Sequence, residues 1–230
     1  MFGLDDHIAS LSDGTTLLVV LLVSVVLGLR HASDPDHLAA VTTLIASGRE
    51  RAARRAGALG FTWGLGHATS LLTFGLPIVL YRAYLPHAVQ RSAETTVGVL
   101  IMGLAVWLLV RWRRGVFHVH AHLHAPAPKS RSPLGAYGIG LVHGMGGSAG
   151  VGVVLLSAIP SHALAVASLA LFAFCTAVSM GLLSTAWGLT LGSGPARRSF
   201  ALLAPVVGLG SLAFGLWYAL GAQSLVPYYF

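Results

Sequence analysis

Residues 163–191 read ALAVASLALFAFCTAVSMGLLSTAWGLTL, an apolar run without a single Lys, Arg, Asp or Glu. About 20 apolar residues are enough for a helix to cross the hydrocarbon core of a bilayer. The run lies inside a longer uncharged region between Arg131 and Arg197, and no charged residue follows Arg198. Only 9% of the chain is charged, against about 25% in soluble domains. The sequence therefore predicts an integral membrane protein with several spans.

Six apolar segments are long enough to be membrane helices, so we expect an all-α, polytopic fold. They lie at residues 15–45, 57–82, 95–112, 135–158, 163–191 and 200–222. Basic residues gather in the loops after the first, third and fifth segments. By the positive-inside rule these loops are cytoplasmic, and both termini lie outside the cytoplasm. The net charge of +7 therefore reflects topology and does not indicate a nucleic-acid partner.

The two halves of the chain resemble each other. Gly28-Leu29-Arg30-His31 matches Gly140-Leu141-Val142-His143, and Val97-Gly98 with Trp107 matches Val207-Gly208 with Trp217. Each half holds three predicted helices, an odd number, so the halves cross the membrane in opposite senses. Inverted repeats are a transporter architecture with a site near the membrane midplane. We expect an extracytoplasmic segment, a first three-helix repeat, a histidine-rich cytoplasmic loop and a second three-helix repeat, at residues 1–14, 15–112, 113–134 and 135–230.

Glycine spacing predicts that some helices pack closely. Small residues recur every four positions at Gly60 and Gly64, and at Gly140, Gly144, Ser148 and Gly152. Such ridges let helix backbones approach one another in lipid, where apolar burial gives no drive to associate.

Several other interpretations are excluded. Cys175 is the only cysteine, which excludes an intrachain disulfide and a thiolate metal cage. Residues 17–29 resemble the apolar part of a signal peptide, but acidic residues precede them, so we interpret them as a helix. The sequence has no P-loop for nucleotide binding.

Ionisable residues crowd one part of the first predicted helix: Arg30, His31, Asp34, Asp36 and His37. An ionisable group inside the membrane costs a few kcal/mol or more, so it is a functional candidate. In a regular helix His31, Asp34 and His37 would share one face. However, Pro35 has no N–H and disfavours α geometry at Asp34, so we expect a break there that could turn Asp36 inward.

Imidazoles with carboxylates make a ligand set that suits Ni²⁺, Co²⁺ or Zn²⁺. The alternative is a helix joint in which Arg30 neutralises an aspartate, but that explains neither histidine. His67 in the second helix and His143 in the fourth are weaker candidates. Either one alone would more often hydrogen-bond between helices than bind an ion.

Two motifs resemble those of the nickel/cobalt transporter family. Residues 31–37, His-Ala-Ser-Asp-Pro-Asp-His, match the family signature, and residues 64–69, Gly-Leu-Gly-His-Ala-Thr, look like its second motif. The six-helix length and the segment 143–150 are more similar to the shorter branch, the urease-accessory-like membrane proteins. Longer members usually have eight helices and an acidic third motif, where this chain is rich in glycine and serine.

The resemblance implies a metal permease in the bacterial cytoplasmic membrane. In it, His31, Asp34, Asp36 and His37 would recognise the ion and His67 would assist. Ni²⁺ or Co²⁺ would be the substrate, with no resident cofactor. Cytoplasmic partners would be a metallochaperone or maturation factors of urease or hydrogenase. The choice of ion and the direction of transport stay open.

Four alternating histidines occupy the loop between the third and fourth helices: His118, His120, His122 and His124. The prolines at 126 and 128 favour an extended or disordered segment. We expect this loop to collect a divalent ion on the cytoplasmic side, releasing protons as it binds. A solvated linker with fortuitous histidines is the alternative.

Two other functions compete with transport. One is a membrane accessory protein that delivers or senses metal without moving it across. The other is an intramembrane serine hydrolase built on Gly146-Gly147-Ser148-Ala149-Gly150. Such an enzyme needs a histidine beside its serine, and the only histidine after that segment is His162. We therefore expect a protein that is not an enzyme.

Overall fold

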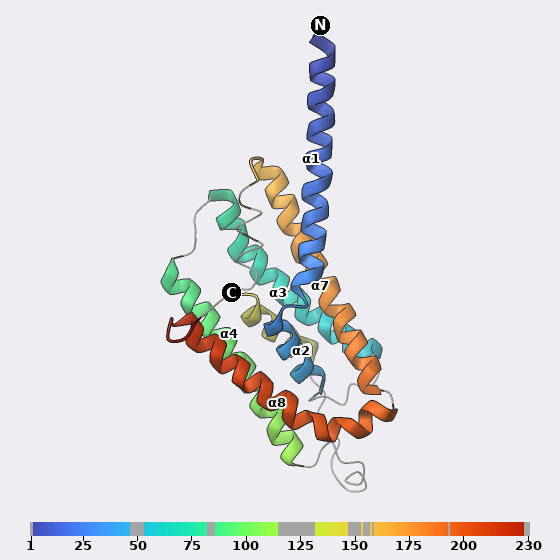
Figure 1. The fold of residues 1–230 in the computed structure, drawn as a ribbon, viewed down its shortest axis with the longest axis vertical. Helices are drawn as coiled ribbons and strands as arrows, with labels where there is room; N and C mark the ends of the chain where they lie inside the picture. Colours follow the sequence, from blue (N-terminus) through green and yellow to red (C-terminus); the bar gives the residue numbers. More distant parts are fainter. Residues whose placement is uncertain are drawn as a thin grey trace.

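The computed structural model of the chain describes residues 2–46, 53–81, 86–114, 132–146, 153, 157, 159–192 and 194–227. Within these residues all regular structure is helical, which confirms the all-α prediction (Figure 1). The helices are α1 (Phe2–His31), α2 (Pro35–Ala46), α3 (Ala53–Tyr81), α4 (His87–Arg113), α5 (Pro133–His143), α7 (His162–Gly192) and α8 (Gly194–Ala222). Val153 and Ser157, between α5 and α7, are also helical.

Several of these helices are long and apolar enough to cross a membrane. Among the described residues four qualify singly, and they lie in α3, α4, α7 and α8. The bent pair formed by α1 and α2 makes a fifth if it is counted as one span. Large apolar side chains on their outer faces are exposed, such as Leu18 in α1, Leu182 in α7 and Leu202 in α8. Such surfaces fit lipid and not water, so the chain is a multi-pass membrane protein.

The first predicted helix is broken where Pro35 predicts a break. α1 ends at His31, α2 begins at Pro35, and the two parts meet at a 47° bend. Because Pro35 cannot donate to the carbonyl of His31, the N–H of Asp34 donates to it instead, at 3.1 Å. The N–H of Ser33 likewise donates to the carbonyl of Arg30 at 2.8 Å. His31, Asp34 and His37 therefore do not share one face of a continuous helix.

The prediction of one helix over residues 135–158 is wrong. α5 begins after Ser132, whose hydroxyl accepts from the N–H of Gly135 at 3.1 Å, and it ends at His143. A turn follows, in which the N–H of Met145 donates to the carbonyl of Val142 at 3.3 Å. The N–H of Gly146 donates to the carbonyl of His143 at 3.2 Å. Glycines have the largest conformational freedom to lose in a helix, so the glycine-rich segment after His143 ends it.

Other helices begin earlier than predicted. α3 begins at Ala53, α4 at His87 and α8 at Gly194. The prediction assigned charged residues to loops. However, Arg54 lies in the first turn of α3, and Arg91 lies in the second turn of α4. Hydropathy marks only the part of a helix inside the hydrocarbon, and a helix continues past that boundary into the polar layer.

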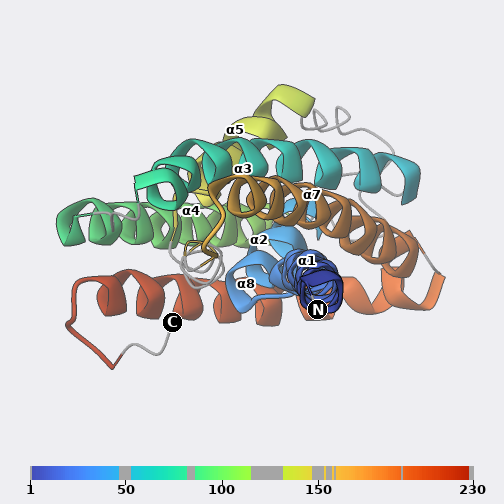
Figure 2. The same cartoon turned by 90° about the horizontal axis from the view of Figure 1, so that it is seen from above.

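α3 lies between α5 and α7, while α4 packs along α8 and α1 along α7 (Figures 1 and 2). Glycines let the backbones of α5 and α7 approach α3 closely on its two sides. A Cβ at Gly64 would lie 2.7 Å from the Cα of Ala177 in α7, and one at Gly66 would collide with the carbonyl oxygen of Tyr137 in α5. From α5, a Cβ at Gly140 would collide with the carbonyl oxygen of Trp63. These contacts confirm the packing role of the glycines; Ser148 and Gly152 lie outside the described residues.

Two glycines of α5 give a test of this packing. Gly140→Ala is expected to destabilise the protein, because the new methyl group meets backbone atoms of α3, which cannot rotate away. Overpacking of this kind costs about 1–3 kcal/mol. Gly138 has nothing within 4 Å of its would-be Cβ, so Gly138→Ala is the matched control and should keep or raise stability. Thermal unfolding of the two variants in detergent, followed by gel filtration, measures the difference. Equal melting temperatures would contradict the close α3–α5 contact.

Candidate metal centre

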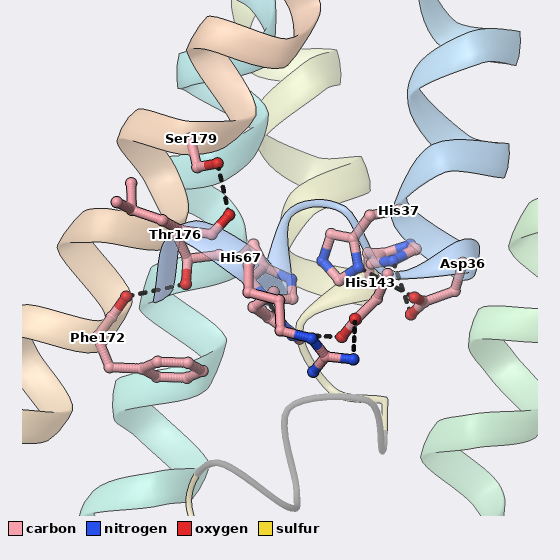
Figure 3. A network of polar contacts seen from close by, with 11 residues as sticks. Asp36, His37, His67, His143, Phe172, Thr176 and Ser179 are labelled. Carbon is pink, nitrogen blue, oxygen red and sulfur yellow. Dashed lines mark hydrogen bonds and ion pairs between the residues drawn. The ribbon is translucent and has the colours of Figure 1, made fainter. Parts of the chain in front are cut away.

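Histidine and aspartate side chains from four helices converge at the break between α1 and α2. His31 is the last residue of α1, and Asp36 and His37 stand in the first turn of α2. His67 comes from the middle of α3, and His143 is the last residue of α5. Figure 3 shows His37, His67 and His143 gathered together, with Asp36 beside His37 and His143. All five are buried.

The local structure around Pro35 turns Asp36 toward this cluster. Proline is favoured at the start of a helix, where its missing N–H is not needed. An acidic residue in the first turn is stabilised by the helix dipole. Asp36 follows Pro35 in that first turn and is only 3% exposed. The break therefore places a carboxylate inside the protein, as the sequence suggested it could.

His31 connects the α1 end of the cluster to α3. Its Nδ1 lies 3.0 Å from Oδ2 of Asp34, and its Nε2 lies 3.0 Å from Nε2 of His67. If Asp34 accepts from Nδ1–H, then Nε2 of His31 has a lone pair directed at the cluster. Carboxylates behind metal-binding histidines fix the ring in this way. Asp34 also lies 3.8 Å from the guanidinium of Arg30, which is exposed. Asp34 is thus at the edge of the cluster.

Asp36 joins the two remaining histidines. Its Oδ1 lies 3.1 Å from Nδ1 of His37, and its Oδ2 lies 3.3 Å from Nε2 of His143. The contact with His143 has the distance of an ion pair but not the alignment of a hydrogen bond. The carboxylate is therefore held between a ring of α2 and a ring of α5.

Several buried ring nitrogens have no hydrogen-bond partner among the described residues: Nε2 of His37, Nδ1 of His67, and Nδ1 and Nε2 of His143. Most buried polar atoms in folded proteins are paired, so each exception needs an explanation. Neutral imidazole nitrogens and a carboxylate are ligands for Ni²⁺, Co²⁺ and Zn²⁺. A divalent ion would be coordinated by the unpaired nitrogens and would offset the buried charge of Asp36. The residues present therefore fit a site for a metal ion.

Two aromatic side chains that were not predicted from the sequence also contact the cluster. The ring of Trp63 lies 5.7 Å from that of His37 and 5.6 Å from that of His143. Phe172 of α7 lies 5.5 Å from His31. Trp63 stands four residues before His67, so it shares a helical face with it, and that spacing could have identified it. No sequence signal identifies Phe172, because only the packing of α7 on α1 brings it there.

Two serine hydroxyls donate hydrogen bonds to backbone carbonyls near the ends of α1 and α5. The hydroxyl of Ser70 in α3 donates to the carbonyl of Leu141 in α5 at 2.6 Å. The hydroxyl of Ser179 in α7 donates to the carbonyl of Leu29 in α1 at 2.8 Å (Figure 3). Both bonds join helices from different halves of the chain, and they hold His31 and His143 at the ends of α1 and α5.

The structure brings together all six residues predicted for the membrane site, with Asp34 at the edge and His143 fully inside. The four loop histidines lie outside the described residues: His118, His120, His122 and His124. So does Ser148, on which the serine hydrolase alternative depends. His162 is exposed at the first residue of α7.

Comparison with known proteins identifies one informative relative. No protein-family model matches the chain, and no solved structure matches it. The chain is 28% identical over 214 residues to the urease accessory protein UreH of Bacillus sp. (strain TB-90), covering 90% of this chain and 92% of the relative. The predicted family resemblance is confirmed. The aligned length takes in both halves of the chain, so the similarity to UreH is not limited to one motif.

Proposed function

We propose that this protein is a secondary transporter that moves Ni²⁺ or Co²⁺ across the cytoplasmic membrane through the cluster at the α1–α2 break. The observation that carries the proposal is the convergence of four buried histidines and a buried aspartate among membrane helices. Polar groups in such a place are expensive and mark ion pathways. The ligands are His31, Asp36, His37, His67 and His143, and Asp34 orients His31.

The proposed architecture is a pair of inverted repeats, with six membrane segments in all. The hydrogen bonds at the end of α1 recur at the end of α5, with Arg30 and His31 replaced by Val142 and His143. Each serine bond between the halves ends at an equivalent carbonyl, that of Leu29 or Leu141. These parallels support two copies of one broken-helix unit. In such transporters freed carbonyls and helix ends surround the substrate near mid-membrane.

The name of the relative, urease accessory protein UreH, supports an accessory role connected with urease. Cytoplasmic partners of this chain would then be a metallochaperone or maturation factors of urease or hydrogenase. The same name favours a second candidate function, a membrane accessory protein that binds the ion without transporting it. The two functions share one site and differ in whether the ion leaves on the other side.

The energy for transport would come from ion gradients or from the membrane potential. The potential is worth about 2.3 kcal/mol per elementary charge per 100 mV. A divalent cation moving inward would gain roughly twice that value. The membrane potential would therefore favour uptake and oppose export.

Flux measurements in cells test the proposal. Cells without nickel and cobalt transporters of their own are loaded with, or exposed to, radioactive Ni²⁺ or Co²⁺, with and without this chain. We expect the chain to change uptake or efflux of at least one ion well above the empty-vector level. Unchanged fluxes in both directions, with the chain present in the membrane, would favour the accessory function instead.

The cytoplasmic loop that the sequence predicts at residues 113–134 gives a further prediction, although Arg113 belongs to α4 and Pro133 to α5. We place it in the cytoplasm with both termini outside, because of its basic residues. Replacing His118, His120, His122 and His124 by alanine should then weaken export most at low cytoplasmic metal, and leave the initial rate of uptake unchanged. The preference between nickel and cobalt should not change, because the sequence predicts an extended segment there, and histidines in such a segment would bind several divalent ions. Rates in both directions at several metal concentrations measure this. A changed ion preference would show that the loop belongs to the selective site.

A further inference from the structure

His37 lies midway between the two histidines that end α1 and α5. Its ring centroid is 4.5 Å from that of His31 and 4.5 Å from that of His143, both edge-on. His31 and His143 are matching residues of the two repeats, whereas His37 has no counterpart among the matching motifs. One ring of the first repeat is thus equally distant from equivalent rings of the two halves.

The cluster contains two sets of three ligands, and His37 belongs to both. One set is His31, His37 and His67, and the other is Asp36, His37 and His143. In each set the ligand atoms lie within 4.8 Å of one another. Three protein ligands with room for a further one are enough to hold a divalent transition metal.

Each set contains a buried nitrogen without a hydrogen-bond partner among the residues that the structure describes. In the first set it is Nδ1 of His67, and in the second it is Nδ1 of His143. The shared residue also has an unpaired nitrogen, Nε2 of His37. Hydrogen bonding within the cluster therefore leaves ring nitrogens that could coordinate a metal ion in both sets, and not in one set alone.

The two sets differ in charge. The first consists of imidazoles, so it is neutral when those rings are unprotonated. The second contains the carboxylate of Asp36, which attracts a divalent cation more strongly and is the harder ligand. The two positions therefore hold the same ion with different affinities and different ligand fields.

We propose that the ion occupies two alternative, overlapping positions, one in each ligand set, and passes between them by exchanging ligands around His37. This inference rests on the proposed function and specifies its path. Bonds from the ion to His31 and His67 break as bonds to Asp36 and His143 form, while His37 stays bound. The oxidation state of the ion does not change, and the proton between the two Nε2 atoms of His31 and His67 moves to Nδ1 of His67 when both rings bind the ion. Because His37 serves both positions, they hold one ion at a time.

Cobalt binding tests the two positions directly. The full-length protein is purified in detergent, and Co²⁺ binding is followed by visible absorption and calorimetry. The same preparations are reconstituted in vesicles for flux. His67→Ala and His143→Ala are a matched pair, because both rings are 1% exposed and each belongs to one set only. His143→Gln and His67→Gln serve if an alanine variant does not remain monodisperse.

The parent protein should bind one Co²⁺ per chain. Each single variant should still bind one Co²⁺ at the set that remains intact. The affinity should fall further in His143→Ala than in His67→Ala, because His143→Ala disrupts the set that contains the carboxylate. The two variants should show different absorption spectra, because each keeps a different ligand set. Flux should fall to the protein-free level in both, because the ion can reach only one position.

Other results would overturn the two-position model. If His143→Ala keeps the parent's spectrum, affinity and flux, the second set is unused. If it loses binding completely, the residues form one site and not two. Two Co²⁺ per chain at saturation would exclude a shared His37. Failure of the proposed function itself looks different: the parent would bind Co²⁺ but show no flux.

Discussion

Replacement of His37 by alanine is expected to reduce nickel and cobalt flux to background while the protein stays in the membrane. The His37 ring is fully buried, and it contacts His31, His67 and His143 as well as Asp36. It belongs to both ligand sets, so its loss removes a ligand from every position of the ion. The effect should exceed the roughly 10–100-fold that loss of an outer partner costs a metal site.

The control for this variant is His162→Ala, which removes an exposed histidine at the start of α7. It should transport like the parent. His37→Gln, which keeps polarity and much of the volume, separates loss of the ligand from loss of packing. Fluxes are compared at equal amounts of protein in the membrane. Equal fluxes in His37→Ala and the parent would remove this cluster from the transport path.

The second large effect is expected from Asp36→Asn. The substitution keeps the shape of the side chain but removes the only fully buried negative charge among the cluster residues described. That charge would offset a divalent ion, and the carboxylate contacts His37 and His143, so we expect transport to fall to near background. Asp34→Asn is the matched comparison, because the Asp34 side chain is 15% exposed and reaches the cluster only through His31.

For Asp34→Asn we expect a reduction of about tenfold, the lower end of the range for an outer partner. Transport is measured at several metal concentrations, so that weaker binding is distinguished from slower movement. An Asp34→Asn variant as impaired as Asp36→Asn would contradict the assignment of Asp34 to the edge. Normal transport by Asp36→Asn would show that the buried carboxylate does not contact the ion.

The break at Pro35 could be predicted because its cause is local. A proline removes one hydrogen bond at a known position, whatever the helix packs against. The end of α5 at His143 could not, because a glycine costs a helix only about 1 kcal/mol and packing often overrides it. Gly140 lies inside α5 and Gly144 lies just after its end, and both lie against the backbone of α3, so a glycine does not by itself mark where the helix ends.

The members of the cluster could be predicted, but not all of their contacts. Ionisable residues in an apolar segment are identified by type alone, and this applies to His31, Asp36 and His37. The contact between His143 and Asp36 depends on where the end of α5 lies relative to α2, which spacing along the chain does not encode. The same applies to Phe172, which reaches His31 only because α7 packs along α1.

Flux through the purified protein in sealed vesicles tests the central claim most directly. The vesicles contain a metal-sensitive dye, and Ni²⁺ or Co²⁺ is added outside under an imposed membrane potential. We expect vesicles with the parent protein to admit the ion well above the level of protein-free vesicles, and vesicles with His37→Ala not to do so. A parent protein that binds the ion in detergent but gives no flux in vesicles, with either sign of potential, would contradict transport.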